Sequence, residues 1–113
     1  MDNHYPKIEN SINTLSQIGV YRGDYFNLDI DLKDDNNNVI DASTFTGQIA
    51  IIDAFMEDIE YLRKTGKIEG NTLKISLSSS DTKKIPIGKY KYVIEIHLPN
   101  GEVKIGKGFI LIL

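Results

Sequence analysis

The C-terminal segment, residues 88–113, constrains the fold more than any other part of the chain. From residue 90 to residue 98, one parity is apolar and the other is mostly polar. The apolar positions are Tyr90, Tyr92, Ile94, Ile96 and Leu98. Because successive side chains on a strand point to opposite faces, this pattern predicts a strand with one buried face. Pro99, Asn100 and Gly101 predict a reversal, after which the chain returns as a second strand.

A hairpin alone is barely stable in water, so the upstream residues must supply partner strands. Residues 25–33 show the clearest alternation, and residues 47–54 and 68–78 predict further strands. Turn-forming residues separate these segments, so that about seven short strands follow one another at intervals of roughly eight to twelve residues. This spacing predicts an all-β fold, a single antiparallel β-sandwich. Residue chemistry alone predicts no reaction.

The domain boundaries are less clear than the strands. Residues 1–19 are polar with sparse apolar positions, which predicts an extended N-terminal arm that includes a short first strand near residues 15–21. Residues 20–113 form the predicted β-sandwich domain. Residues 55–65 fit either a helix or a strand, and we favour the strand because the neighbouring segments are β. A capped helical turn is predicted near residues 79–84.

Composition excludes several classes of function. The chain of 113 residues has a net charge of −3, which argues against a general nucleic-acid-binding protein. It contains no cysteine, so it has no disulfide, no thiolate metal site and no cysteine nucleophile. No apolar run is long enough to span a membrane, and the first residues lack the pattern of a signal peptide. We therefore expect a protein that folds in a cytoplasm and has neither a nucleic-acid nor a membrane partner.

We predict no catalytic residue, no cofactor and no metal. Local spacing places no carboxylate or hydroxyl beside His4 or His97. An acidic cluster lies at one strand end, and we interpret it as a solvated turn, with a calcium site between residues 29 and 38 as the alternative. It comprises Asp29, Asp31, Asp34 and Asp35. We expect Tyr90 and Tyr92 to be core residues whose hydroxyls reach the rim of the core. The alternative is that the two rings form a platform on which sugars or bases stack.

The triplet Arg22, Gly23 and Asp24 matches an integrin-recognition tripeptide. Three residues carry little specificity. Because the triplet precedes a strong strand, we expect Gly23 to serve a bend or a bulge.

The end of the chain suggests a contact surface. Residues 110–113 are apolar on both parities, whereas an antiparallel strand with one solvated face would alternate. Either both faces are covered within the domain, or one face meets another chain. The candidate interface combines this strand with the apolar positions of the arm. Its residues are Ile8, Ile12, Leu15, Ile18, Phe109, Ile110, Leu111, Ile112 and Leu113.

Several short sequence motifs from about residue 20 onward resemble those of a family of phage virion domains, the immunoglobulin-like β-sandwiches of tail, baseplate and neck components. The family includes the N-terminal domain of phage baseplate upper proteins. Residues 22–34 look like its opening strand and acidic turn, residues 39–41 and 45–49 like its short return and second strand, and residues 70–78 with 81–82 like its middle strand and cap. Residues 88–92, 100–101 and 108–109 look like its final hairpin.

The resemblance implies a non-enzymatic structural protein of a phage virion: a tail, baseplate, neck or capsid-decoration subunit. Its partners would be other virion proteins, it would be a homo-oligomer or present in many copies, and it would assemble in the host cytoplasm. Baseplate upper proteins continue into further domains, whereas this chain stops at Leu113, so we expect a small stand-alone subunit. The alternative is a bacterial adhesion or carbohydrate-binding β-sandwich module.

Overall fold

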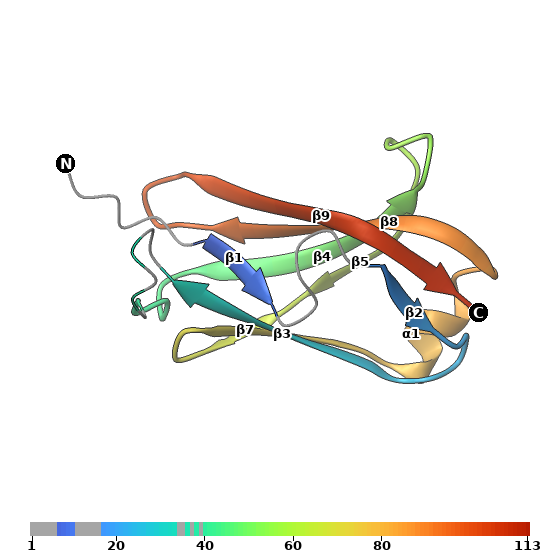
Figure 1. Ribbon diagram of the computed structural model, residues 1–113, viewed down its shortest axis with the longest axis horizontal. Coiled ribbons are helices and arrows are strands. Elements are labelled where there is room, and N and C mark those ends of the chain that lie inside the picture. The colour runs from blue at the N-terminus through green and yellow to red at the C-terminus, as the bar shows by residue number, and fades with distance from the viewer. Residues whose placement is uncertain (1–6, 11–16, 34–35, 37, 39) are drawn as a thin grey trace.

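The protein is an elongated two-layer sandwich of strands (Figure 1). This computed structural model describes residues 7–10, 17–33, 36, 38 and 40–113, with side chains described from residue 17 onward. The described part holds nine strands and one short helix. In chain order they are β1 (Lys7–Asn10), β2 (Ile18–Val20), β3 (Phe26–Lys33), β4 (Thr46–Asp53), β5 (Glu60–Thr65), β6 (Lys67–Glu69), β7 (Thr72–Leu77), α1 (Ser79–Lys83), β8 (Gly88–His97) and β9 (Val103–Ile112).

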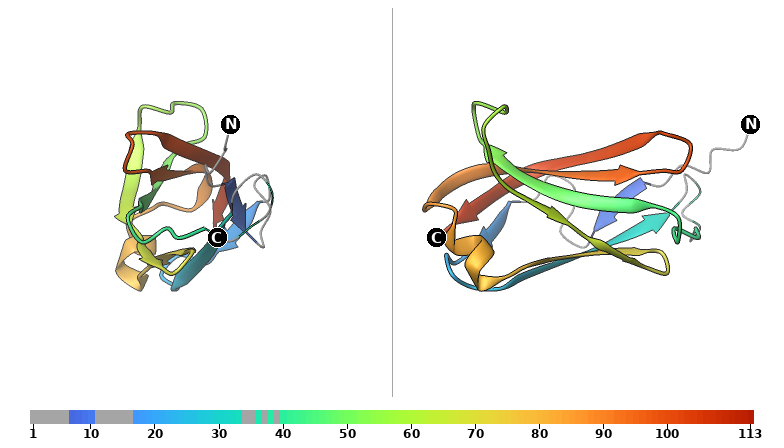
Figure 2. Two further views of the ribbon diagram at one scale, coloured as in Figure 1. Left: turned by 90° about the vertical axis from the view of Figure 1, so that its left-hand side faces the viewer. Right: turned by 180° about the vertical axis from the view of Figure 1, so that it is seen from behind.

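The strands form a four-stranded sheet in the order β1-β3-β7-β6 and a five-stranded sheet in the order β2-β9-β8-β4-β5. The end-on view in Figure 2 shows the two layers face to face. All neighbouring strands are antiparallel except β2 and β9, which are parallel. The predicted fold class, an all-β immunoglobulin-like sandwich, is confirmed. The strand order also fits, because β1, β3, β7 and β6 take the places of strands A, B, E and D in one sheet of an immunoglobulin sandwich, and β4, β8 and β9 take those of C, F and G in the other.

The predicted extended arm over residues 1–19 is wrong where the structure describes it. β1 pairs with β3, from Lys7 opposite Lys33 to Asn10 opposite Ile30. β2 pairs with the end of β9 and buries Ile18 and Val20 in the core. Both pieces find hydrogen-bond partners on sheet edges, so no boundary falls at residue 19. The short strand predicted near residues 15–21 is confirmed as β2.

Other local predictions are confirmed. Of the ambiguous segment, residues 60–65 form the strand β5, which pairs along β4 with a register shift between Ile51 and Ile52, and residues 55–59 belong to a loop. The final hairpin joins β8 to β9 in register from Gly88 opposite Ile112 to His97 opposite Val103. All five residues on the apolar parity of residues 90–98 are buried.

The helical turn α1 is held by its cap. The Asp81 amide donates a hydrogen bond to Ser78 Oγ over 3.1 Å, and the Ser78 amide donates to Asp81 Oδ2 over 2.8 Å. Lys64 Nζ lies 2.9 Å from the same carboxylate oxygen. The hydrogen bond from Lys64, followed by that from the Ser78 amide, lowers the pKa of Asp81 to about 2. This pair therefore ties the edge strand β5 to the turn between the two sheets.

Two buried tyrosines of β8 differ in the hydrogen bonding of their hydroxyl groups. Tyr90 Oη donates a 2.6 Å hydrogen bond to the carbonyl of Pro86. In immunoglobulin domains a tyrosine at this corner makes the same backward bond, two residues before the second cysteine of the inter-sheet disulfide. In this chain, Tyr92 occupies that cysteine position. Its hydroxyl is buried and has no hydrogen-bond partner among the described residues, so the prediction of a hydroxyl at the rim is wrong for Tyr92.

Candidate functional site

The outer face of β9 carries a row of apolar side chains, which are exposed except for the half-buried Leu111. Of the outward-facing positions, every one except Lys107 is apolar. We call these apolar residues the β9 stripe: Val103, Ile105, Phe109, Leu111 and Leu113. Ile105 is 56% exposed and Leu113 is 46% exposed. A monomer gains nothing by showing several apolar side chains on one strand face to water, so this stripe is the best candidate for a contact surface.

The structure explains why residues 110–113 are apolar on both faces of the strand: one face packs into the core and the other belongs to the stripe. Ile110 and Ile112 face inward and are buried in the core, and Ile18 is buried beside them on β2. For these three residues the predicted interface is wrong, because the domain itself covers their side chains. Phe109, Leu111 and Leu113 remain candidates.

The rest of the predicted interface lies outside the described side chains. Ile8 lies in β1, but its side chain is not described, and Ile12 and Leu15 lie outside the described residues altogether. The sequence reasoning also missed Val103 and Ile105. Extending the alternation of Phe109 and Leu111 backward along the strand would have found both.

Lysines surround the aromatic member of the stripe. Lys89 Nζ lies 4.4 Å from the centre of the Phe109 ring, close enough for a cation–π interaction. Glu57 bridges two more lysines, with Oε2 3.0 Å from Lys91 Nζ and Oε1 3.7 Å from Lys107 Nζ. The hydrogen bond from Lys91 is the main cause of the lowered pKa of Glu57. The face is therefore cationic and apolar at the same place, although the whole chain is acidic.

A hollow of about 330 Å³ opens beside Phe109. We call it the Phe109 hollow; it is lined by Glu57, Lys91, Lys107, Gly108 and Phe109. Its wall on one side comes from the loop between β4 and β5, residues 54–59. This loop stands out from the strands in Figure 1 and in both views of Figure 2.

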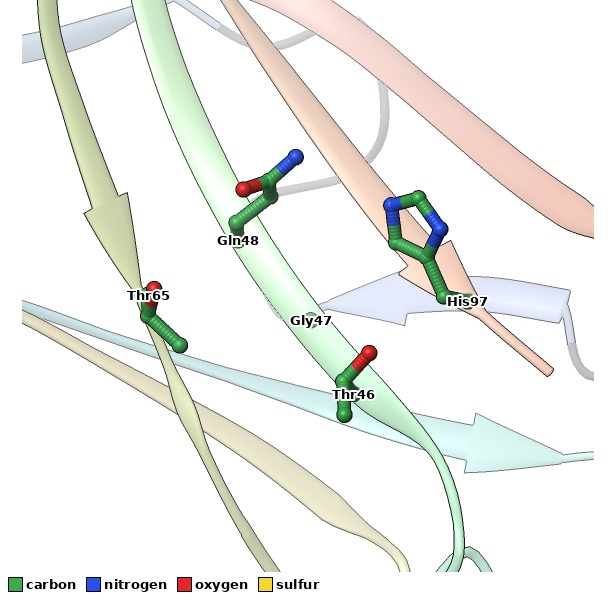
Figure 3. A pocket seen from close by; sticks show the side chains of 5 residues that line it. All are labelled: Thr46, Gly47, Gln48, Thr65 and His97. Atoms are coloured by element: carbon green, nitrogen blue, oxygen red, sulfur yellow. The ribbon is translucent and has the colours of Figure 1, made fainter. Parts of the chain in front are cut away.

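A second hollow, of about 370 Å³, lies at the other end of the same sheet and is lined by Thr46, Gly47, Gln48, Thr65 and His97. Figure 3 shows its lining residues, which come from the neighbouring strands β4, β5 and β8. Close to it, Gln48 Nε2 donates to Glu95 Oε2 over 2.9 Å, and His97 Nε2 lies 3.3 Å from the same oxygen. The prediction that no carboxylate lies beside His97 is therefore wrong, because Glu95 and His97 share one face of β8. The hydrogen bond from Gln48 is the largest of the effects that lower the pKa of Glu95. Glu95 is therefore engaged as an acceptor, and in the described part of the chain no base is hydrogen-bonded to the hydroxyl of Thr46 or Thr65.

The acidic strand end does not form a metal site in the described part. Asp31 accepts a 3.0 Å hydrogen bond from Thr72 Oγ1, and Asp29 lies opposite Lys74. No group of three or more histidine, aspartate or glutamate side chains converges anywhere among the described residues. Asp34 and Asp35 lie outside them, so a calcium ion at this turn stays an untested alternative.

The Arg22–Asp24 triplet is a structural turn. Gly23 has a φ of 93°, which favours glycine, and its amide donates to Thr82 Oγ1 over 2.9 Å. Arg22 donates two hydrogen bonds to the Lys83 carbonyl, at 3.1 and 2.7 Å. The prediction that Gly23 serves a bend is confirmed, and the Arg22 side chain is occupied within the chain.

No protein-family model matches the sequence, and no curated protein matches it. Several solved structures have a fold similar to that of this chain. CopC from Methylosinus trichosporium OB3b has a TM-score of 0.52 at 9% identity, with 96% of this chain and 92% of that chain covered. The soluble domain of PmoD from Methylocystis sp. ATCC 49242 (Rockwell) has a TM-score of 0.51 at 8% identity, covering 84% and 77% of the two chains. The likeness shows the fold alone.

Among the described residues, no helix is long and apolar enough to cross a membrane.

Proposed function

We propose that this protein is a non-enzymatic structural subunit of a phage virion that docks onto other virion proteins through the β9 stripe. The observation that carries the docking role is the exposed apolar row on the outer face of β9. The phage setting rests on the resemblance of the chain from about residue 20 onward to virion sandwich domains.

The physical basis of docking is removal of the stripe from water. Each large apolar side chain that becomes buried contributes on the order of 1–2 kcal/mol, because apolar area contributes about 25 cal/mol per Å². Ile105 and Leu113 expose enough surface to gain this in full. The lysines beside Phe109 would orient the partner and favour acidic groups on it. A subunit repeated by virion symmetry needs only a modest affinity at each contact, because many contacts form together.

Incorporation into particles tests the proposal. Phage that lack the gene are complemented with the wild-type protein, with Ile105→Asp, or with Ile87→Asp as a matched control. Ile87 is 71% exposed and lies in the loop before β8, outside the stripe. We expect Ile105→Asp to lower the amount of protein in purified particles by about tenfold or more, since a buried unpaired carboxylate weakens a contact by more than 1.4 kcal/mol.

Ile87→Asp should incorporate normally, and neither change should alter the melting temperature by more than about 2 °C. Normal incorporation of Ile105→Asp would refute docking through the stripe. Absence of the wild-type protein from particles, together with binding to cells or polysaccharides, would favour the adhesion or carbohydrate-binding alternative.

A further inference from the structure

Two apolar features, a projection and a hollow, lie next to each other at the outer face of the five-stranded sheet. One is a projection, the tip of the β4–β5 loop, where Phe55 is 94% exposed and Met56 is 61% exposed. We call these two residues the knob. The other is the Phe109 hollow. Glu57 follows the knob directly in sequence and lines the hollow, so both features belong to one continuous surface.

The knob is held in a fixed conformation. Asp53 Oδ2 accepts hydrogen bonds from the amides of Phe55 (2.9 Å) and Met56 (2.8 Å), and the Met56 amide is the main cause of the lowered pKa of Asp53. The Asp53 amide donates to the Ile59 carbonyl, and the Ile59 amide donates to the Met56 carbonyl. Glu57 then ties the loop to β8 and β9. A loop that is already ordered loses little conformational entropy when its tip is bound.

The charges of the two features are also complementary. Lys91 and Lys107 line the hollow, and both are paired with Glu57. A third lysine, Lys89, lies over the ring of Phe109, which lines the same hollow. Lys89 is engaged with the Phe109 ring and, in the described part of the chain, forms no ion pair. Asp58, two residues after the knob, is exposed and likewise has no ion-pair partner among the described residues. An acidic, apolar projection thus lies beside a basic, apolar hollow.

We propose that a second copy of this chain seats its knob in the Phe109 hollow, while the first copy does the same in return. A two-fold symmetric interface requires one surface that carries both halves of the contact, since residue i of one copy meets residue j of the other and the reverse. The knob and the hollow meet this requirement, and Asp58 of each copy approaches Lys89 of its partner. The dimer goes beyond docking onto other virion proteins and can be tested with the isolated chain.

Sedimentation velocity of the purified full chain across micromolar to millimolar concentrations tests the dimer. We expect a reversible monomer–dimer equilibrium, with Phe55→Ser weakening it by about tenfold or more, as truncation of an aromatic anchor does. Tyr25→Ser is the matched control, because Tyr25 is 75% exposed and precedes a strand of the other sheet. The Phe55 ring lies outside the core, so its loss should not change the melting temperature. A monomer at every concentration, a larger oligomer, or a dimer insensitive to Phe55→Ser would each overturn the proposal.

Disulfide trapping tests the reciprocal arrangement, because the chain has no cysteine of its own. Met56→Cys and Lys107→Cys proteins are mixed under mild oxidation, with Phe55 left in place. We expect the mixed dimer to form faster than either self-linked dimer. Preferential self-linkage of Met56→Cys would mean that the tips meet each other and would overturn the arrangement. If the chain is monomeric yet Ile105→Asp still blocks incorporation, the dimer is rejected and the docking proposal stands.

Discussion

The buried hydroxyl of Tyr92 leads to a prediction of unusual sign: Tyr92→Phe should stabilise the protein. The side chain is 1% exposed, and Oη has no hydrogen-bond partner in the described part of the chain. An unsatisfied buried hydroxyl costs about 1–3 kcal/mol in lost hydration. Removing it leaves a small void that offsets part of the gain. We expect a net increase of about 1 kcal/mol in the free energy of unfolding, which raises the melting temperature by roughly 4 °C.

Tyr90→Phe is the matched control for the same chemical change on the same strand. The Tyr90 hydroxyl donates to the Pro86 carbonyl, so its removal loses a hydrogen bond and should destabilise by about 1 kcal/mol. Urea unfolding followed by circular dichroism measures both variants, with equal m-values required for the comparison. If Tyr92→Phe is no more stable than the wild type, then the Tyr92 hydroxyl is satisfied in solution and the reasoning fails.

The place of the Tyr92 ring against β9 can be tested separately with Gly108→Ala. A Cβ at Gly108 would meet the ring at Oη and Cζ and, at 2.5 Å, at Cε2. The ring is rigid and its surroundings are packed, so we expect a loss of about 2–3 kcal/mol. In the background of Tyr92→Leu the same change should be at least about 1 kcal/mol less harmful, because the ring is gone. Equal losses in the two backgrounds would show that the ring does not limit residue 108.

Three further predictions concern the frame of the sandwich. The pKa of Asp81 is lowered to about 2 from 3.8, so the contribution of its carboxylate to the free energy of unfolding is complete above about pH 4 and is lost as the pH falls through 2. We expect the free energy of unfolding to fall by about 2 kcal/mol over this window in the wild type, and this loss should be absent in Asp81→Asn. Deleting residues 1–20 should lower the free energy of unfolding by several kcal/mol in urea titrations, because Ile18 and Val20 leave the core; a truncated chain of unchanged stability would contradict the pairing of β2 with β9. Gly23→Ala should lower the melting temperature by about 4 °C, because φ is 93° there, and an unchanged melting temperature would mean that the turn relaxes without strain.

The long alternating strands were predictable, because their pattern alone separates the buried from the solvated face. Residues 26–33 and 90–98 are of this kind. β1 and β2 were missed as parts of the sandwich, since strands of four and three residues are too short to show a period. Their pairing with β3 and β9 depends on contacts that span most of the chain, and no local pattern carries such information.

The candidate site was predictable only in part. The apolar end of β9 pointed to a contact, but both parities were apolar, and only the packing of Ile110 and Ile112 decides which one faces outward. The exposure of Phe55 could not be inferred either, because its spacing from Ile59 and Leu62 fitted a buried helix face. The lysines around Phe109 come from two strands and are brought together by the register of β8 and β9.

The parallel pairing of β2 with β9 has a mechanical consequence. Ile18–Val20 lies beside Ile110–Ile112, and the pairing is extended by bonds from Leu113 N to the Val20 carbonyl and from Arg22 N to the Leu113 carbonyl. In a parallel pair, pulling the start of one strand away from the end of the other slides the strands along each other. These hydrogen bonds would therefore bear tension together rather than opening one after another. Force spectroscopy with handles at the two chain ends should find a high rupture force, and early, gradual yielding would contradict this.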